Sequence, residues 1–144
     1  MSRYYAWDSQ ACSACRKELL SVLSSGKLSE ELGPDPRTVA VYPSYATQVL
    51  FWTPHRVIFA NYHNISESSA RDFFGFWHAA TPQEARPYAR RRQMASVLEC
   101  APCEEAPASS FINNLDKAGL PGWVRPVKDN PGRGKGLVWY GLAP

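Results

Sequence analysis

Residues Thr38–Asn64 read TVAVYPSYATQVLFWTPHRVIFANYHN, and this stretch carries the strongest fold signal in the chain of 144 residues. Its first run, Thr38–Tyr42, is continuously apolar and β-branched, which is typical of a strand buried in a parallel sheet. The run His55–Asn61 predicts a second strand. Between the two, Tyr45–Trp52 predicts a short helix, with a strand as the alternative.

Further apolar runs alternate with helical patterns along the rest of the chain. The other expected elements are helices at Ser13–Leu23, Ser66–Ala80, Thr81–Arg92 and Ser109–Ala118, strands at Met94–Cys100 and Leu137–Leu142, an extended segment at Leu120–Lys128 and a loop at Lys27–Arg37. Strands joined by helical crossovers predict an α/β fold, here a single three-layer domain with a small, mostly parallel sheet of about four strands. We expect residues 1–11 to form an N-terminal arm and residues 12–144 to form the domain.

The composition is that of an ordinary globular domain. The net charge is +3, which is milder than a dedicated nucleic-acid binder usually shows. No apolar run approaches the roughly 18–20 residues of a membrane span, and the first residues lack the apolar core of a signal peptide. We therefore expect either a cytosolic protein or a piece of a larger one. No phosphate-binding loop, hydrolase motif or zinc-protease motif occurs, so no catalytic residue is predicted.

Four cysteines form two CxxC pairs, Cys12/Cys15 and Cys100/Cys103. Four thiolates satisfy a tetrahedral zinc ion, but the pairs are separated by far more than the roughly 15–20 residues typical of zinc ribbons. One or two disulfides in an oxidising compartment would explain the same residues, as would free or redox-active thiols. All three interpretations are compatible with the sequence.

Two histidines flank the second strand of the opening stretch. A straight strand places His55 and His63 roughly 25 Å apart, so they are not expected to bind one metal ion. His63 lies with Tyr62 and Asn64 just beyond the carboxyl end of the strand, where parallel sheets bind ligands. These three residues are therefore candidate ligand contacts, and His55 is either a contact or a structural hydrogen-bonding residue.

A basic cluster, Arg86 and Arg90–Arg92, lies toward the end of the helix that Thr81–Glu84 is expected to begin as a capping box. Cations near a helix C-terminus are favoured by its dipole, which explains the cluster without a ligand. An anionic surface, such as phospholipid headgroups or a lipid-linked diphosphate, is the alternative. Pro87 is expected to kink this helix or to divide it into two pieces.

Short motifs occur along the chain in a recognisable order: Thr53-Pro54-His55 before a strand, Tyr62-His63-Asn64 after it, Pro82-Gln83-Glu84-Ala85 at a helix start, a strand ending in Cys100, and Trp123–Val127. In this order the chain resembles the C-terminal soluble domain of bacterial polytopic membrane proteins in the lipid-sugar-dependent glycosyltransferase superfamily. More distantly, it is similar to the soluble domain of the oligosaccharyltransferase catalytic subunit. The Trp-Trp-Asp-Tyr-Gly motif of that subunit would fall on Tyr42–Tyr45, where Ser44 replaces the aspartate.

The resemblance implies a periplasmic domain that is non-catalytic alone and supports or gates a membrane-embedded site for a polyprenyl-linked sugar. Its implied partner is the membrane-spanning region of its own protein, with no nucleic acid and with no cofactor in this domain. Tyr45 then joins His55, Tyr62, His63 and Asn64 as a candidate ligand contact.

The same resemblance favours disulfides, because the periplasm is oxidising. Pairing between the N-terminal CxxC and Cys100 or Cys103 would pin the first helix to the end of the third strand. The alternative is a self-contained cytosolic α/β module for protein or nucleic-acid interaction, in which Cys12, Cys15, Cys100 and Cys103 hold one zinc ion.

Overall fold

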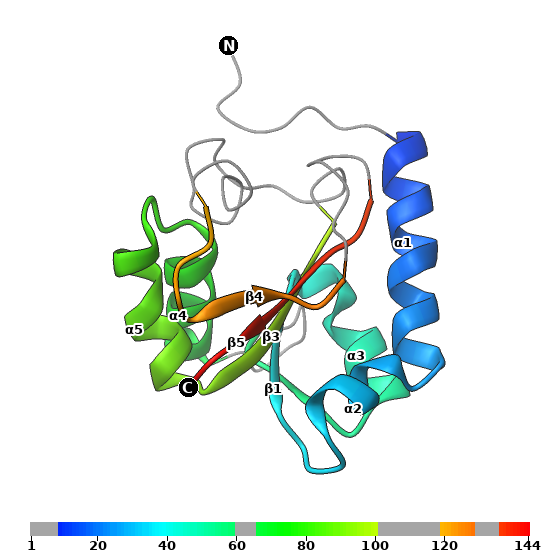
Figure 1. The fold of residues 1–144 in the computed structure, drawn as a ribbon, viewed down its shortest axis with the longest axis horizontal. Coiled ribbons are helices and arrows are strands. Elements are labelled where there is room, and N and C mark those ends of the chain that lie inside the picture. Colours follow the sequence, from blue (N-terminus) through cyan, green and yellow to red (C-terminus); the bar gives the residue numbers. More distant parts are fainter. Residues whose placement is uncertain (1–8, 60–65, 101–118, 129–135) are drawn as a thin grey trace.

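The structure is a computed structural model, which describes residues 9–59, 66–100, 119–128 and 136–144. The helices are α1 (Ser9–Ser24), α2 (Lys27–Leu32), the 3-10 helix η1 (Pro43–Tyr45), α3 (Ala46–Trp52), α4 (Glu67–Trp77) and α5 (Pro82–Arg91). The strands are β1 (Thr38–Val41), β2 (Arg56–Val57), β3 (Met94–Glu99), β4 (Val124–Pro126) and β5 (Val138–Leu142). Figure 1 shows the sheet with α4 and α5 on one side and α1, α2 and α3 on the other. None of the helices in these residues is long and apolar enough to cross a membrane.

In the described residues, five strands form one mixed sheet in the order β2-β1-β3-β5-β4. β1 pairs in parallel with β2 and β3, whereas β5 is antiparallel to β3 and β4. The expected α/β class is confirmed, but the sheet is mixed rather than mostly parallel, and β4 arises in the segment expected only to be extended. Only residues 127–137 connect β4 to β5, whereas parallel neighbours need a crossover of about a dozen residues or more.

Alternate strand residues pack against the two groups of helices. Val39 and Val41 of β1 belong to a core that includes residues of α1, α2 and α3, whereas Ala40 lies in the core formed with α4 and α5. In that second core, Phe73 and Trp77 stack with their ring centroids 5.1 Å apart. Because helices cover both faces of the sheet, every residue of β3 is buried, which explains the continuous apolar runs in the sequence.

The predicted loop at Lys27–Arg37 begins with a helix, α2, so this prediction was wrong for its first half. Gly26 has a φ of 82° and Gly33 a φ of 88°, and these two glycines bound the helix. Leu28 is fully buried, and this burial stabilises a helix that is too short to form by itself. The residues Gly33-Pro34-Asp35-Pro36 therefore indicated a loop only in the second half of Lys27–Arg37.

Two other boundaries differ from the prediction, at α1 and β2. α1 begins at Ser9, inside the expected N-terminal arm, and α3 confirms a helix over the strand alternative. β2 comprises only Arg56–Val57, whereas the strand was expected to reach Asn61. The end of that expected strand, in residues 60–65, and the expected helix Ser109–Ala118 lie outside the described residues.

α5 begins with the predicted Thr81 cap, whereas the Glu84 side chain accepts from Ala80, one residue before the cap. The Glu84 N–H donates to Thr81 Oγ1 at 3.2 Å, and the Ala80 N–H donates to Glu84 Oε2 at 3.2 Å. The helix continues through Pro87, which therefore does not divide it into two pieces. Pro87 is the sixth residue of α5, so its missing N–H costs only the one hydrogen bond that the Gln83 carbonyl would otherwise accept.

Candidate functional site

The carboxyl edge of the parallel strands is the candidate functional site. β1 ends at Val41 and is followed by Tyr42, and β3 ends at Glu99 and is followed by Cys100. Parallel neighbours end at the same edge, which is where open α/β sheets bind ligands. Glu99 is only 1% exposed and Tyr42 is half-buried. This edge therefore combines a buried carboxyl group with an aromatic ring.

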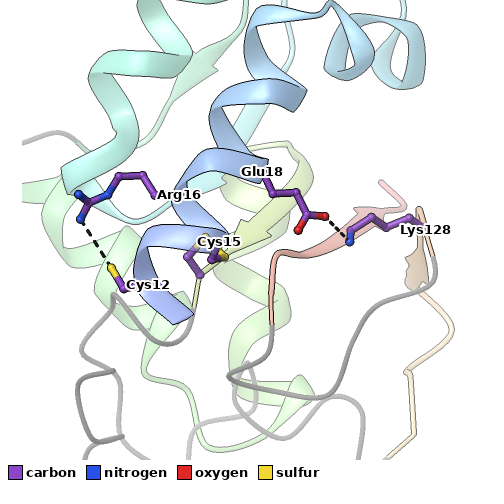
Figure 2. The surroundings of a disulfide bond; sticks show 6 residues. Cys12, Cys15, Arg16, Glu18 and Lys128 are labelled. Atoms are coloured by element: carbon purple, nitrogen blue, oxygen red, sulfur yellow. Dashed lines mark hydrogen bonds and ion pairs between the residues drawn. A yellow bond between two sulfur atoms is a disulfide. The ribbon is translucent and has the colours of Figure 1, made fainter. Parts of the chain in front are cut away.

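A disulfide between Cys15 and Cys100 joins α1 to the end of β3 (Figure 2), with the two Cα atoms 5.8 Å apart. The disulfide prediction is confirmed for these two residues. Cys12 is also disulfide-bonded, and Cys103 lies outside the described residues. While the Cys15–Cys100 bond persists, neither sulfur is available as a thiolate ligand, so the alternative four-cysteine zinc site requires reduction first.

Arg16 brings a positive charge to this edge, beside the predicted contact residue Tyr45. The Arg16 Cζ lies 6.0 Å from the centroid of the Tyr45 ring, and Arg16 Nη2 lies 3.6 Å from Cys12 Sγ (Figure 2). Tyr45 is only 4% exposed, whereas Arg16 is exposed. Sequence reasoning missed Arg16, although its position four residues after Cys12 places both on one face of α1.

An ion pair also connects α1 to the segment that follows the edge strand β4. The Glu18 Oε1 lies 2.7 Å from Lys128 Nζ, just beyond the end of β4 (Figure 2). Both side chains are partly exposed, so this ion pair contributes at most about 1 kcal/mol. The Cys15–Cys100 disulfide is therefore a stronger connection for α1 than this ion pair.

His55 lies at the opposite edge, at the amino end of β2, and is buried. Its Nδ1 accepts the Arg37 backbone N–H at 3.1 Å, so in the neutral ring Nε2 carries the proton and donates to Ser29 Oγ at 3.1 Å. The His55 N–H donates to Thr53 Oγ1 at 3.1 Å. Burial, and then the positive charge of Arg37, lower the pKa of His55 below its usual value. These contacts correspond to the structural interpretation of this histidine.

The lowered pKa of His55 predicts a loss of stability in mild acid. Between its usual pKa of about 6.5 and its lower folded pKa, the unfolded chain binds a proton that the folded chain does not. We expect the free energy of unfolding, from urea titrations between about pH 7.5 and 5, to fall by up to about 1.4 kcal/mol per pH unit. His55→Asn should flatten this dependence, and His78→Gln, at the exposed end of α4, should not. If the free energy of unfolding changed with pH equally steeply in both variants, the pH dependence could not be assigned to His55.

The remaining predicted contacts, Tyr62, His63 and Asn64, lie outside the described residues. Of the predicted contacts that are described, the structure places Tyr45 at the carboxyl edge and His55 at the amino edge, so it does not bring these two together. Within the described residues, no group of three or more His, Cys, Asp or Glu side chains is arranged to hold a metal ion.

The fold is similar to that of a known oligosaccharyltransferase domain. No family model matches the sequence, and no curated protein is significantly similar to it. The structure is similar to the C-terminal globular domain of an oligosaccharyltransferase from Archaeoglobus fulgidus, with a TM-score of 0.59 and 14% sequence identity. The match covers 88% of this chain and 95% of that chain. At this identity the likeness shows a shared fold.

Proposed function

We propose that this chain is the extracytoplasmic domain of a membrane-embedded glycosyltransferase. The observation that carries the proposal is the fold match, which spans 88% of this chain and 95% of the oligosaccharyltransferase domain. The Cys15–Cys100 disulfide supports it, because such bonds persist in oxidising compartments such as the periplasm. The domain is non-catalytic alone and supports or gates a site for a polyprenyl-linked sugar in the membrane-spanning region of its own protein.

The proposed site for the lipid-linked sugar is the carboxyl edge of β1, where Tyr45 and Arg16 lie. Tyr45, Tyr62, His63 and Asn64 are the contact residues, and Arg16 supplies a cation beside Tyr45 for an anionic diphosphate. His55 acts instead through its internal hydrogen bonds, which fix the amino end of β2.

Binding of a polyprenyl-diphosphate-linked sugar to the oxidised chain tests this function. We expect binding, followed by tryptophan fluorescence in detergent, without transfer or hydrolysis of the sugar. Arg16→Gln should weaken binding by about three- to tenfold, as loss of one charge contact predicts, and His63→Gln should also weaken it. Lys17→Gln, which removes the same charge from the next position of α1, is the matched control. Sugar transfer by the chain alone would contradict the non-catalytic role, and absence of binding would contradict the site.

The zinc-binding alternative makes the opposite prediction for the cysteines. A cytosolic interaction module should contain one zinc ion per chain and release four titratable thiols after chelation. The extracytoplasmic domain should contain no metal and show blocked thiols until a reductant is added. Thiol titration with metal analysis of a non-reduced sample separates the two.

A further inference from the structure

A cavity of about 410 Å³ lies at the amino edge of the sheet, away from the carboxyl-edge site, and three arginines line it. Arg37 precedes β1, Arg56 is the first residue of β2, and Arg90 lies in the last turn of α5. All three are exposed to solvent. The residues lining the cavity include no aspartate or glutamate.

The sheet register places Arg56 directly beside Thr38, the residue that follows Arg37. Thr38 of β1 is directly paired with Arg56 of β2 on one side and with Met94 of β3 on the other, and all three line the cavity. The Arg56 N–H donates to the Arg37 carbonyl at 2.9 Å, and Arg56 Nη2 lies 3.4 Å from the Pro36 carbonyl. A backbone hydrogen bond therefore joins Arg56 to Arg37, and a side-chain hydrogen bond holds the Arg56 guanidinium near the Pro36 carbonyl.

The basic run at the end of α5 divides into two parts. Arg91 and Arg92 form ion pairs with Asp72 of α4, at 2.8 and 2.6 Å. Within the described residues, Arg37, Arg56 and Arg90 have no carboxylate within ion-pairing distance. The ion pairs with Asp72 agree with a structural role for Arg91 and Arg92. They do not neutralise the charge of Arg90, which lines the cavity with Arg37 and Arg56.

We propose that this cavity binds a phosphate group. Three arginines from three separate segments line it, and guanidinium groups bind phosphate oxygens through charge-assisted hydrogen bonds. The carboxyl end of α5 adds about half a negative charge, and the α-carboxylate of Pro144 adds one in the 144-residue chain. The three cations still exceed this negative charge. Gln93, which also lines the cavity, supplies a neutral donor.

An exposed apolar surface at the end of α3, a few residues before Arg56 in the chain, makes a phospholipid headgroup one source of this phosphate. Phe51 is 75% exposed and Trp52 is 50% exposed at the end of α3, and their rings meet edge to face at 4.9 Å. Only Thr53–His55 separate them from Arg56, so the Cα atoms of Trp52 and Arg56 are at most roughly 14 Å apart. Aromatic side chains beside cations are typical of surfaces that contact membrane interfaces. A soluble diphosphate is the other source.

Titration of the oxidised chain with inorganic diphosphate at low salt tests the site, followed by NMR shifts of the arginine side-chain N–H groups. We expect Arg56→Gln and Arg90→Gln each to weaken binding by about fivefold or more. Arg71→Gln, which removes the same charge from an exposed position of α4 outside the cavity, should change it less than about twofold. An equal loss in Arg71→Gln would mean diffuse charge attraction and would overturn the proposal.

Vesicle sedimentation distinguishes the two sources. Binding to phosphatidylglycerol but not phosphatidylcholine vesicles, lost in Arg56→Gln and in the double variant Phe51→Ser/Trp52→Ser, identifies a headgroup. Diphosphate binding without vesicle binding identifies a soluble phosphate. Absence of binding to both probes overturns the proposal, as does vesicle binding that Arg56→Gln and Arg90→Gln leave unchanged. All substituted side chains are exposed, so circular dichroism should show folded variants.

Discussion

Full reduction of the chain is expected to lower its melting temperature by on the order of 10–20 °C. The Cys15–Cys100 bond joins positions separated by 85 residues, so it removes much conformational freedom from the unfolded chain. In the chain-entropy account, a loop of this length is worth about 4.5 kcal/mol. Scanning calorimetry with and without dithiothreitol measures the shift.

The variant Cys15→Ala/Cys100→Ala separates this bond from the one formed by Cys12, which a reductant also breaks. Without reductant, the variant should melt between the oxidised and the reduced wild-type chain. Both sulfur atoms are fully buried, so the small voids left by alanine should contribute to the loss. Identical melting of the wild-type chain with and without reductant would show that neither disulfide contributes to stability.

Substitution of Asp72 by asparagine is expected to lower the free energy of unfolding by about 2–3 kcal/mol. Asp72 is only 2% exposed, and its two oxygens lie 2.8 Å from Arg91 Nη1 and 2.6 Å from Arg92 Nε. Loss of one partner from a buried ion pair typically costs about 3–5 kcal/mol. The expected loss is smaller because the Arg91 and Arg92 side chains are 59% and 28% exposed and can regain water.

Urea denaturation of Asp72→Asn, Arg92→Gln and the double variant measures this coupling. We expect the double variant to be less destabilised than the sum of the single ones, because each single change already removes the shared interaction. Glu67→Gln, at an exposed position in the first turn of the same helix, should cost less than about 1 kcal/mol. Additive losses would show that Asp72 and Arg92 act independently.

Features that depend on a short stretch of sequence could be predicted. The continuous apolar run at Thr38–Tyr42 predicted β1, because a strand covered on both faces needs no polar alternation. Thr81 and Glu84 predicted the start of α5, because a capping box involves residues within one helical turn. Strand direction at β4 and β5 depends on long-range pairing, which local pattern does not encode.

The candidate sites depended on contacts between distant residues, and these could be predicted only in part. The partner of His55 is Ser29, 26 residues away, and nothing in either local pattern marks the pair. The partner of Cys15 could not be derived, because four cysteines allow several pairings. In the sequence, nothing distinguishes Arg90 from Arg91 and Arg92. Only the structure shows that Asp72 of α4 forms ion pairs with Arg91 and Arg92.

The two edges of the sheet are held by different kinds of chemistry. At the carboxyl edge, α1 is attached by a covalent bond between Cys15 and Cys100, whose integrity depends on the redox potential of the surroundings. At the amino edge, the connection before β1 is attached to β2 through the neutral ring of His55, which depends on proton concentration. Reductants and acid should therefore loosen opposite ends of the same domain.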